Sequence, residues 1–309
     1  MTHEGILFIG DPHISSRPPG FRSDDYPRTI LDKLAWCMEY ARKNKLKTAL
    51  LGDLFHYPRD NANWLVTELI ELLSPQVPLA IYGNHDVREN VLSQDDSLSI
   101  LAASGAIEML TGDEPWGGTI AGRQVVIGGT SWGKKLPAGH DSPADHVFWM
   151  THHDLIVPGY EEIGRVKPKV LPGIDAVING HIHRHLETIE KGETSWITPG
   201  NIARVSRGDA SRQHQPAVLQ IQFQKEGWQA ERVTVPHGSF EDVFYEQVIE
   251  EEAVMAGSTF IHGLAEMKAR RTESGAGLKE FLAANLGSFD QDVQGEINKL
   301  AERYVAHDE

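Results

Sequence analysis

Five short segments rich in Asp, Asn and His occur in this chain, and each follows an apolar run that is typical of a buried strand. They offer carboxylate, amide and imidazole groups, and none of them contains a thiol. Such donors suit hard or borderline divalent ions such as Mn, Fe, Zn or Co better than soft ions. The five segments are Asp11-Pro-His13, Gly52-Asp53, Gly83-Asn-His-Asp86, His152-His153 and Gly180-His-Ile-His183.

Together the five segments predict a two-metal site that cleaves phosphoester bonds. Two ions about 3.5–4 Å apart can acidify a water, hold phosphate oxygens and stabilise the leaving oxygen. Such a pair needs a bridging carboxylate and separate oxygen and imidazole ligands for each ion. Each segment alone has an ordinary structural interpretation, such as a strand end or a type I′ turn, so the prediction depends on the ordered set. The candidate ligands are Asp11, His13, Asp53, Asn84, His152, His181 and His183.

Alternating strands and helices are expected to position the first three segments. The order strand, helix, strand, helix, strand implies parallel strands joined by right-handed crossovers. In such sheets ligands gather at the carboxyl ends of the strands, which is where Asp11, Asp53 and Asn84 fall. Apolar periodicity predicts strands at residues 5–11, 47–53 and 77–83, and helices at residues 28–43 and 63–73.

The pattern of the second half of the chain predicts further strands followed by a helical tail. Turn signals at Lys191-Gly192 and Glu226-Gly227 indicate hairpins, so a second sheet packed on the first is expected. We predict a catalytic domain at residues 1–238 and a small, acidic helical appendage at residues 239–309. Strands of the second sheet are expected at residues 125–129, 147–151 and 176–179.

The composition of the 309 residues is that of an ordinary globular protein, with 40% hydrophobic and 24% charged residues. The formal net charge of −15 argues against tight, non-specific binding of nucleic acid, but 15 acidic and only 6 basic residues lie from Glu241 onward. No apolar run of about 18 residues predicts a membrane span. The single cysteine, Cys37, cannot form an internal disulfide. Together with the absence of an evident secretory signal, it favours a cytoplasmic location.

The five ordered segments resemble those of the calcineurin-like metallophosphoesterase superfamily over roughly residues 5–205. The resemblance implies an α/β fold, an αββα sandwich of two mixed sheets flanked by helices. It assigns Asp53 as the bridge between two ions, and His152 rather than His153 as the ligand of the fourth segment. It also implies that His85 acts as an acid and stabilises the transition state, a role that suits an imidazole. The remaining implied ligands are Asp11, His13 and His183 for one ion, and Asn84, His152 and His181 for the other.

Two further segments resemble the SbcD-like branch of this superfamily, the nucleases that repair DNA double-strand breaks. Gly52-Asp-Leu-Phe-His56 resembles their bridging-aspartate segment, which implies a supporting catalytic role for His56; an exposed loop histidine is the alternative. Residues 198–207 resemble a segment in which Asn201 here replaces the usual serine. This segment makes Arg204 and Arg207 candidate phosphate contacts, with solubilising surface arginines as the alternative.

Three classes of function are compatible with these features. The first is a DNA exonuclease and endonuclease that uses two divalent ions per chain, with Mn2+ expected first and Fe, Zn or Co as alternatives. The second is a phosphodiesterase or phosphatase that acts on small nucleotides or other phosphoesters. The third is a non-enzymatic scaffold, against which the intact ligand set argues. The expected partners are DNA, an SbcC-type ATPase docked on the tail, and a second copy in a homodimer, although the tail could instead pack on its own core.

Overall fold

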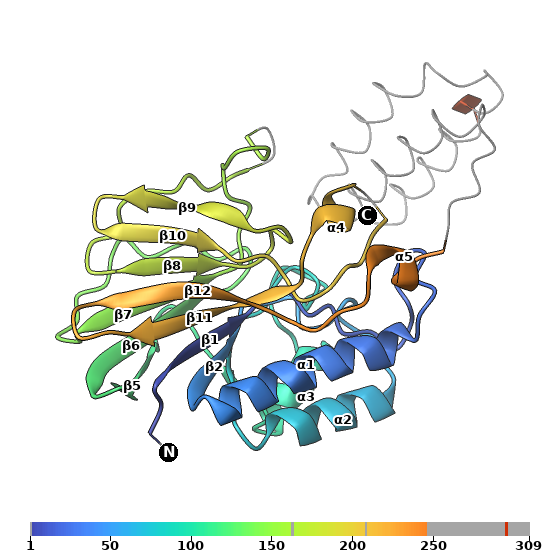
Figure 1. Cartoon of the computed structure of the whole chain (residues 1–309), viewed down its shortest axis with the longest axis horizontal. Helices are drawn as coiled ribbons and strands as arrows, with labels where there is room; N and C mark the ends of the chain where they lie inside the picture. The colour runs from blue at the N-terminus through green and yellow to red at the C-terminus, as the bar shows by residue number, and fades with distance from the viewer. Residues whose placement is uncertain (1, 162–163, 208, 246–293, 296–309) are drawn as a thin grey trace. The chain divides into compact units, whose positions relative to one another are not determined.

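The structure is a computed structural model that describes residues 2–161, 164–207, 209–245 and 294–295. Contacts divide the chain into Met1–Tyr245 and Glu246–Glu309. Most of the predicted helical appendage lies outside the described residues, so the appendage and the predicted boundary at residue 238 stay predictions. Within the first unit, two mixed sheets of six strands each confirm the predicted pair of sheets (Figure 1).

The first sheet carries the three strands predicted near the N-terminus. Its strand order is β12-β11-β1-β2-β3-β4, with β1 to β4 parallel and β11 antiparallel to both β1 and β12. The parallel part has the strand–helix–strand connections that the sequence predicts. Its strands are β1 (Gly5–Ile9), β2 (Leu46–Leu50), β3 (Leu79–Ala80), β4 (Glu108–Met109), β11 (Ala217–Phe223) and β12 (Trp228–Thr234).

The second sheet contains the three predicted strands of the second half, each within two residues of its expected position. Its strand order is β5-β6-β7-β8-β10-β9, with a parallel centre from β6 to β10 and antiparallel strands at both edges. The predicted turn at Gly192 joins a hairpin of this sheet, whereas the predicted turn at Gly227 joins the β11–β12 hairpin of the first sheet; both glycines have positive φ. The strands are β5 (Trp116–Ile120), β6 (Arg123–Thr130), β7 (His146–Thr151), β8 (Ala176–Asn179), β9 (Leu186–Lys191) and β10 (Thr194–Thr198).

Alternating apolar residues divide the core into layers. Along β1, Leu7 and Ile9 face the helices, whereas Ile6 and Phe8 face the second sheet, because successive side chains of a strand point to opposite faces. Figure 1 shows the three longer helices on one side of the first sheet. In the described part, loop residues such as Leu155 cover the outer face of the second sheet. The helices are α1 (Tyr26–Lys43), α2 (Asn63–Leu73), α3 (Ser97–Ala103), and the short α4 (Asp209–Gln213) and α5 (Phe240–Val243).

Several predicted elements differ from the observed ones at their ends, and helix α1 and strand β3 show why. Helix α1 starts two residues early because Asp25 caps it and a proline stands in its first turn, a position where the missing N–H costs nothing. Strand β3 is much shorter than residues 77–83 because the chain leaves the sheet after Ile81, and the Tyr82 N–H bonds the Ser131 hydroxyl instead. Among the helices of the described residues, none is long and apolar enough to cross a membrane.

Candidate metal centre

The five predicted segments meet where strands of both sheets end. They lie on the loops that follow β1, β2, β7 and β8 and on the turn after β3. Three groups of side chains could hold a cation, and the ligand atoms of each group lie within 4.8 Å of one another; one of them is His13, His56 and His85. The other two contain Asp53, and we call them the His13 side, formed by His13, Asp53 and His183, and the His152 side, formed by Asp53, His152 and His181. Asp53 is shared, as a bridge would be, although the ligand role of each residue stays a prediction.

On the His13 side, two imidazoles face each other beside the shared carboxylate. The Nε2 atoms of His13 and His183 are 2.9 Å apart, and His13 Nε2 is 3.7 Å from Asp53 Oδ2. Burial lowers the pKa of His13 well below its usual value, and burial also lowers the pKa of His183 to about 3. Both rings are therefore neutral, which is the state that metal ligation requires.

On the His152 side, hydrogen bonds to fixed acceptors orient both imidazoles. The Nδ1–H of His152 donates to the Leu51 carbonyl at 2.7 Å, which leaves Nε2 directed at Asn84 Oδ1, 3.3 Å away. The Nε2–H of His181 donates to Asp154 at 2.6 Å, which leaves Nδ1 2.9 Å from the same Asn84 oxygen. In neutral rings these two nitrogens carry lone pairs, so a cation among the three atoms would satisfy all of them.

The carboxylates supply the charge that a cation would neutralise. Burial alone would lower the pKa of His152, but Asp53, 3.2 Å from its Nε2, and Asp11 outweigh burial and raise this pKa to about 10. Asp11 Oδ1 accepts from the His181 backbone N–H at 2.9 Å. Its second oxygen, Oδ2, is buried without a hydrogen-bond partner, and burial raises the pKa of Asp11 to about 7. An orphaned carboxylate oxygen beside converging imidazoles fits a bound cation.

The backbone of the site adopts positive φ angles, which are uncommon for residues other than glycine. Four of the predicted ligands have positive φ, namely Asp11 at 38°, His13 at 49°, Asp53 at 47° and His181 at 66°. Such strain clusters at functional sites because the surrounding fold must impose it. The glycines of the segments allow close approach: a Cβ on Gly83 would collide with the Asp53 carboxylate.

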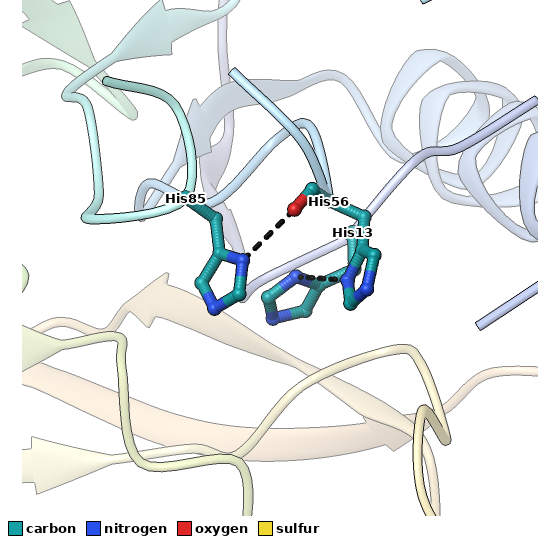
Figure 2. A group of neighbouring side chains, drawn as sticks. All are labelled: His13, His56 and His85. Atoms are coloured by element: carbon teal, nitrogen blue, oxygen red, sulfur yellow. Dashed lines mark hydrogen bonds between the residues drawn. The ribbon is translucent and has the colours of Figure 1, made fainter. Parts of the chain in front are cut away.

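His85 and His56 lie beside the His13 side (Figure 2). The His85 Nδ1–H donates to the His56 carbonyl at 2.9 Å, and the His85 backbone N–H donates to Asp53 Oδ1 at 2.7 Å. This leaves His85 Nε2 as the atom that can take up or release a proton. His56 is half-buried, its ring 5.3 Å from that of His85, and burial lowers its pKa to about 4. His56 is therefore not the exposed loop histidine of the alternative interpretation.

Asp86 ties together the two loops that carry these histidines. Its two carboxylate oxygens accept from the backbone N–H groups of Phe55 and Gly83, each at 2.9 Å. The side chain is fully buried. Asp86 thus fixes the turn that carries His85 against the loop whose His56 carbonyl orients the His85 imidazole.

Three other predicted residues lie away from both sides of the centre. Arg204 is buried and donates to the backbone carbonyls of His214 and Gly238. The Arg207 guanidinium lies over the Phe21 ring, 3.7 Å from its centroid. Neither arginine bonds a residue of the two metal groups in the described structure, and their phosphate contacts stay predictions. His153 donates to the Lys134 carbonyl at 2.8 Å and belongs to neither group.

Sequence reasoning missed two side chains that contact His181. Asp154 accepts its Nε2–H, and the Trp132 ring lies 4.9 Å from its ring. An acidic residue directly after His152-His153 was a visible signal for Asp154. Trp132 has no comparable signal, because its loop after β6 carries none of the five segments.

The residues present therefore fit two divalent ions. His13 and His183 with Asp53 would hold one, and His152 and His181 with Asn84 and Asp53 the other. The donors are oxygens and imidazole nitrogens, and the orphaned Asp11 Oδ2 supplies a further anionic oxygen. Such ions would supply Lewis acidity and lower the pKa of a bound water at a site with buried carboxylates.

Comparisons with solved structures find matches at low sequence identity. A hypothetical protein from Thermus thermophilus is 13% identical with a TM-score of 0.45, and covers 75% of this chain and 100% of its own. Vacuolar protein sorting 29 from Cryptosporidium parvum is 13% identical with a TM-score of 0.32, covering 77% and 100%. A Vps29 double mutant from Entamoeba histolytica is 16% identical with a TM-score of 0.31, covering 75% and 99%. These likenesses are too distant to carry an argument about function.

Comparison with protein families gives a more specific result. No curated protein matches the sequence. Residues 5–185 match the calcineurin-like phosphoesterases, and this range, more than half of the chain, contains all seven predicted ligands together with His56 and His85. The chain belongs to the calcineurin-like phosphoesterase family, and its chemistry is metal-dependent hydrolysis of phosphoesters.

Proposed function

We propose that this phosphoesterase is a two-metal DNA nuclease of the SbcD-like kind. The observation that carries the proposal is the position of His56, which comes from the segment that resembles these nucleases. Its carbonyl accepts the Nδ1–H of His85 at 2.9 Å, and its Nδ1 lies 3.4 Å from His13 Nδ1 (Figure 2). The residue that sets this branch apart thus contacts both the expected acid and an expected ligand.

The chain's own residues would divide the reaction among them. The Asp53 carboxylate would hold both sides of the centre together, and His85 Nε2 would donate a proton to the 3′ oxygen that leaves the phosphorus. The His56 carbonyl keeps His85 in the required orientation. Mn2+ is the proposed ion because oxygen and imidazole donors suit it. DNA is the proposed substrate, and an SbcC-type ATPase or a second copy of the chain is a proposed partner.

Cleavage of end-labelled DNA tests the proposal. Single- and double-stranded DNA are incubated with Mn2+ beside bis-p-nitrophenyl phosphate, using the wild type, His85→Gln and the control His140→Gln. His140 lies outside both sides of the centre. We expect the wild type and the control to degrade DNA, and His85→Gln to lose about 10²–10⁴-fold in rate while it keeps two ions per chain. The lengths of the products give the polarity.

Hydrolysis of the small diester with intact DNA would contradict the nuclease proposal for the isolated chain. The alternative phosphodiesterase that acts on small nucleotides would then be favoured. Addition of an SbcC-type ATPase separates the two explanations, because only a nuclease that depends on this partner would gain DNA cleavage.

A further inference from the structure

A carboxylate outside the seven predicted ligands contacts the imidazole of His181. Asp154 Oδ1 lies 2.6 Å from His181 Nε2, and the two side chains are 20% and 23% exposed. The loop fixes Asp154 itself, because its backbone carbonyl accepts from the N–H groups of Arg165 and Val166 at 2.8 and 2.9 Å. The second carboxylate oxygen is 3.9 Å from Arg165 Nε. The short bond to His181 therefore starts from an anchored residue.

This bond determines which nitrogen of His181 is available. An ionised carboxylate only accepts hydrogen bonds, so the proton of a neutral His181 ring stays on Nε2 and the lone pair on Nδ1. Nδ1 faces Asn84 Oδ1 at 2.9 Å, toward the His152 side.

A second contact limits the rotation of the same ring. The Trp132 and His181 ring centroids are 4.9 Å apart, with 32° between the ring planes. Asp154 thus fixes one edge of the imidazole while Trp132 lies near its face. His152, the other imidazole of this side, is oriented by the main-chain carbonyl of Leu51. Of the two orienting acceptors, only Asp154 is a side chain, so only this one can be removed by substitution.

We propose that Asp154 is a positioning residue that presents His181 Nδ1 to one of the two divalent ions and thereby sets the affinity of that ion. The inference rests on the two-metal centre of the proposed function, but it does not depend on the substrate. A carboxylate bonded to a ligating histidine fixes the tautomer and raises the basicity of the ligand, and its loss costs about 10–100-fold in metal affinity. We expect that loss on the His152 side alone, because Asp154 bonds His181 and not the imidazoles of the His13 side.

Titration calorimetry of Mn2+ into the metal-free full chain tests this inference. The variants are Asp154→Ala, Asp154→Asn and the control Asp141→Asn, which changes an exposed acid of another loop. We expect the wild type and the control to bind two ions. Asp154→Ala should bind one ion about 10–100-fold more weakly and the other with its affinity changed by less than about twofold. Asp154→Asn keeps an acceptor oxygen without the charge, so its loss should be intermediate.

Circular dichroism of each metal-free variant establishes that it is folded, and the asparagine variant provides the result if the alanine variant is not. Two ions bound to Asp154→Ala with wild-type affinities would overturn the inference. So would an equal weakening of both ions in a folded variant, because that result indicates a general structural role. A wild type that binds fewer than two ions would instead overturn the two-metal centre itself, together with the proposed function.

Discussion

The two sides of the metal centre are prepared for a cation in different ways. On the His152 side, the Leu51 carbonyl and Asp154 fix the imidazoles before any ion binds. On the His13 side, both nitrogens of His13 face other imidazoles, with Nε2 2.9 Å from His183 and Nδ1 3.4 Å from His56. No carbonyl or carboxylate acceptor fixes the His13 tautomer in the described contacts. One side is therefore oriented by the protein, and the other is ordered chiefly by the ion it would hold.

The pKa values of the ligand histidines are lowered on the His13 side, whereas that of His152 is raised on the other side. The pKa values of His13 and His183 are lowered, chiefly by burial, so their rings are already neutral. The pKa of His152 is raised to about 10 because Asp53 and Asp11 outweigh its burial. A cation on the His152 side must displace a proton from a well-oriented ring. The protein thus orients the imidazoles on the His152 side and keeps them neutral on the His13 side, and Asp53 belongs to both sides.

The largest expected effect comes from the residue that both sides share. Asp53→Ala removes the carboxylate within reach of both groups, so we expect the loss of both ions and a fall in activity of about 10³-fold or more. This exceeds the 10–100-fold effect typical of a carboxylate that only supports a ligand. Metal analysis after gel filtration and hydrolysis of bis-p-nitrophenyl phosphate measure the two effects. Two ions retained per chain would show that Asp53 is not the bridge.

A smaller effect is expected from His56, which borders the His13 side. His56→Ala keeps the backbone carbonyl that orients His85, so we expect a loss in kcat of only about tenfold, less than the 10²–10⁴-fold range of a general acid. Both ions should remain. The comparison becomes sharper because His13, His56 and His85 also form a group that could hold a cation. A loss of bound metal in this variant would indicate that His56 is itself a ligand and belongs to the His13 side.

The sequence predicted the parts of the site that depend on local patterns. Apolar runs that end in Asp11, Asp53 or His152 predict strands and the edge at which their ends meet, and the structure has that arrangement. The strand order of the second sheet could not be predicted from the sequence, because β10 lies between β8 and β9 and only tertiary packing decides such a crossover. The positive φ of Asp11 and Asp53 is likewise imposed by the fold.

Contacts between distant loops were also beyond reach. The bond from Asp154 to His181 spans 27 positions in the chain, and no periodicity of either segment encodes it. Arg204 illustrates the same limit: its guanidinium donates to carbonyls of residues 10 and 34 positions away, contacts that no local pattern indicates. A residue type indicates the chemistry that a side chain can perform, whereas the partner depends on the loops that surround it.

The smallest expected effect is on the pH dependence of folding stability, and it comes from a histidine outside both sides of the centre. Removing this contribution helps to separate the part that comes from the histidines of the His13 side. His214 is buried, and its Nε2–H donates to the Asn201 carbonyl at 2.9 Å. Burial, aided by the charge of Arg204, lowers the pKa of His214 from 6.5 to about 4. The unfolded chain therefore takes up this proton near pH 6.5, whereas the folded chain does so only near pH 4. Folding stability from this residue is full above pH 7 and is lost as the pH falls between these two values.

Between pH 7 and pH 5, His214 should lower the free energy of unfolding by about 2 kcal/mol. His214→Gln keeps a donor for the Asn201 carbonyl but cannot be protonated, so it should lose about 2 kcal/mol less than the wild type over this range. Urea unfolding of both metal-free proteins at the two pH values measures the difference. If the free energy of unfolding of the variant still falls between pH 7 and pH 5, that fall includes the contribution of His13 and His183. Their lowered pKa values also make the folded chain less stable as the pH falls. Identical pH dependence in the two proteins would contradict the assignment to His214 and would leave the His13 side as the larger source.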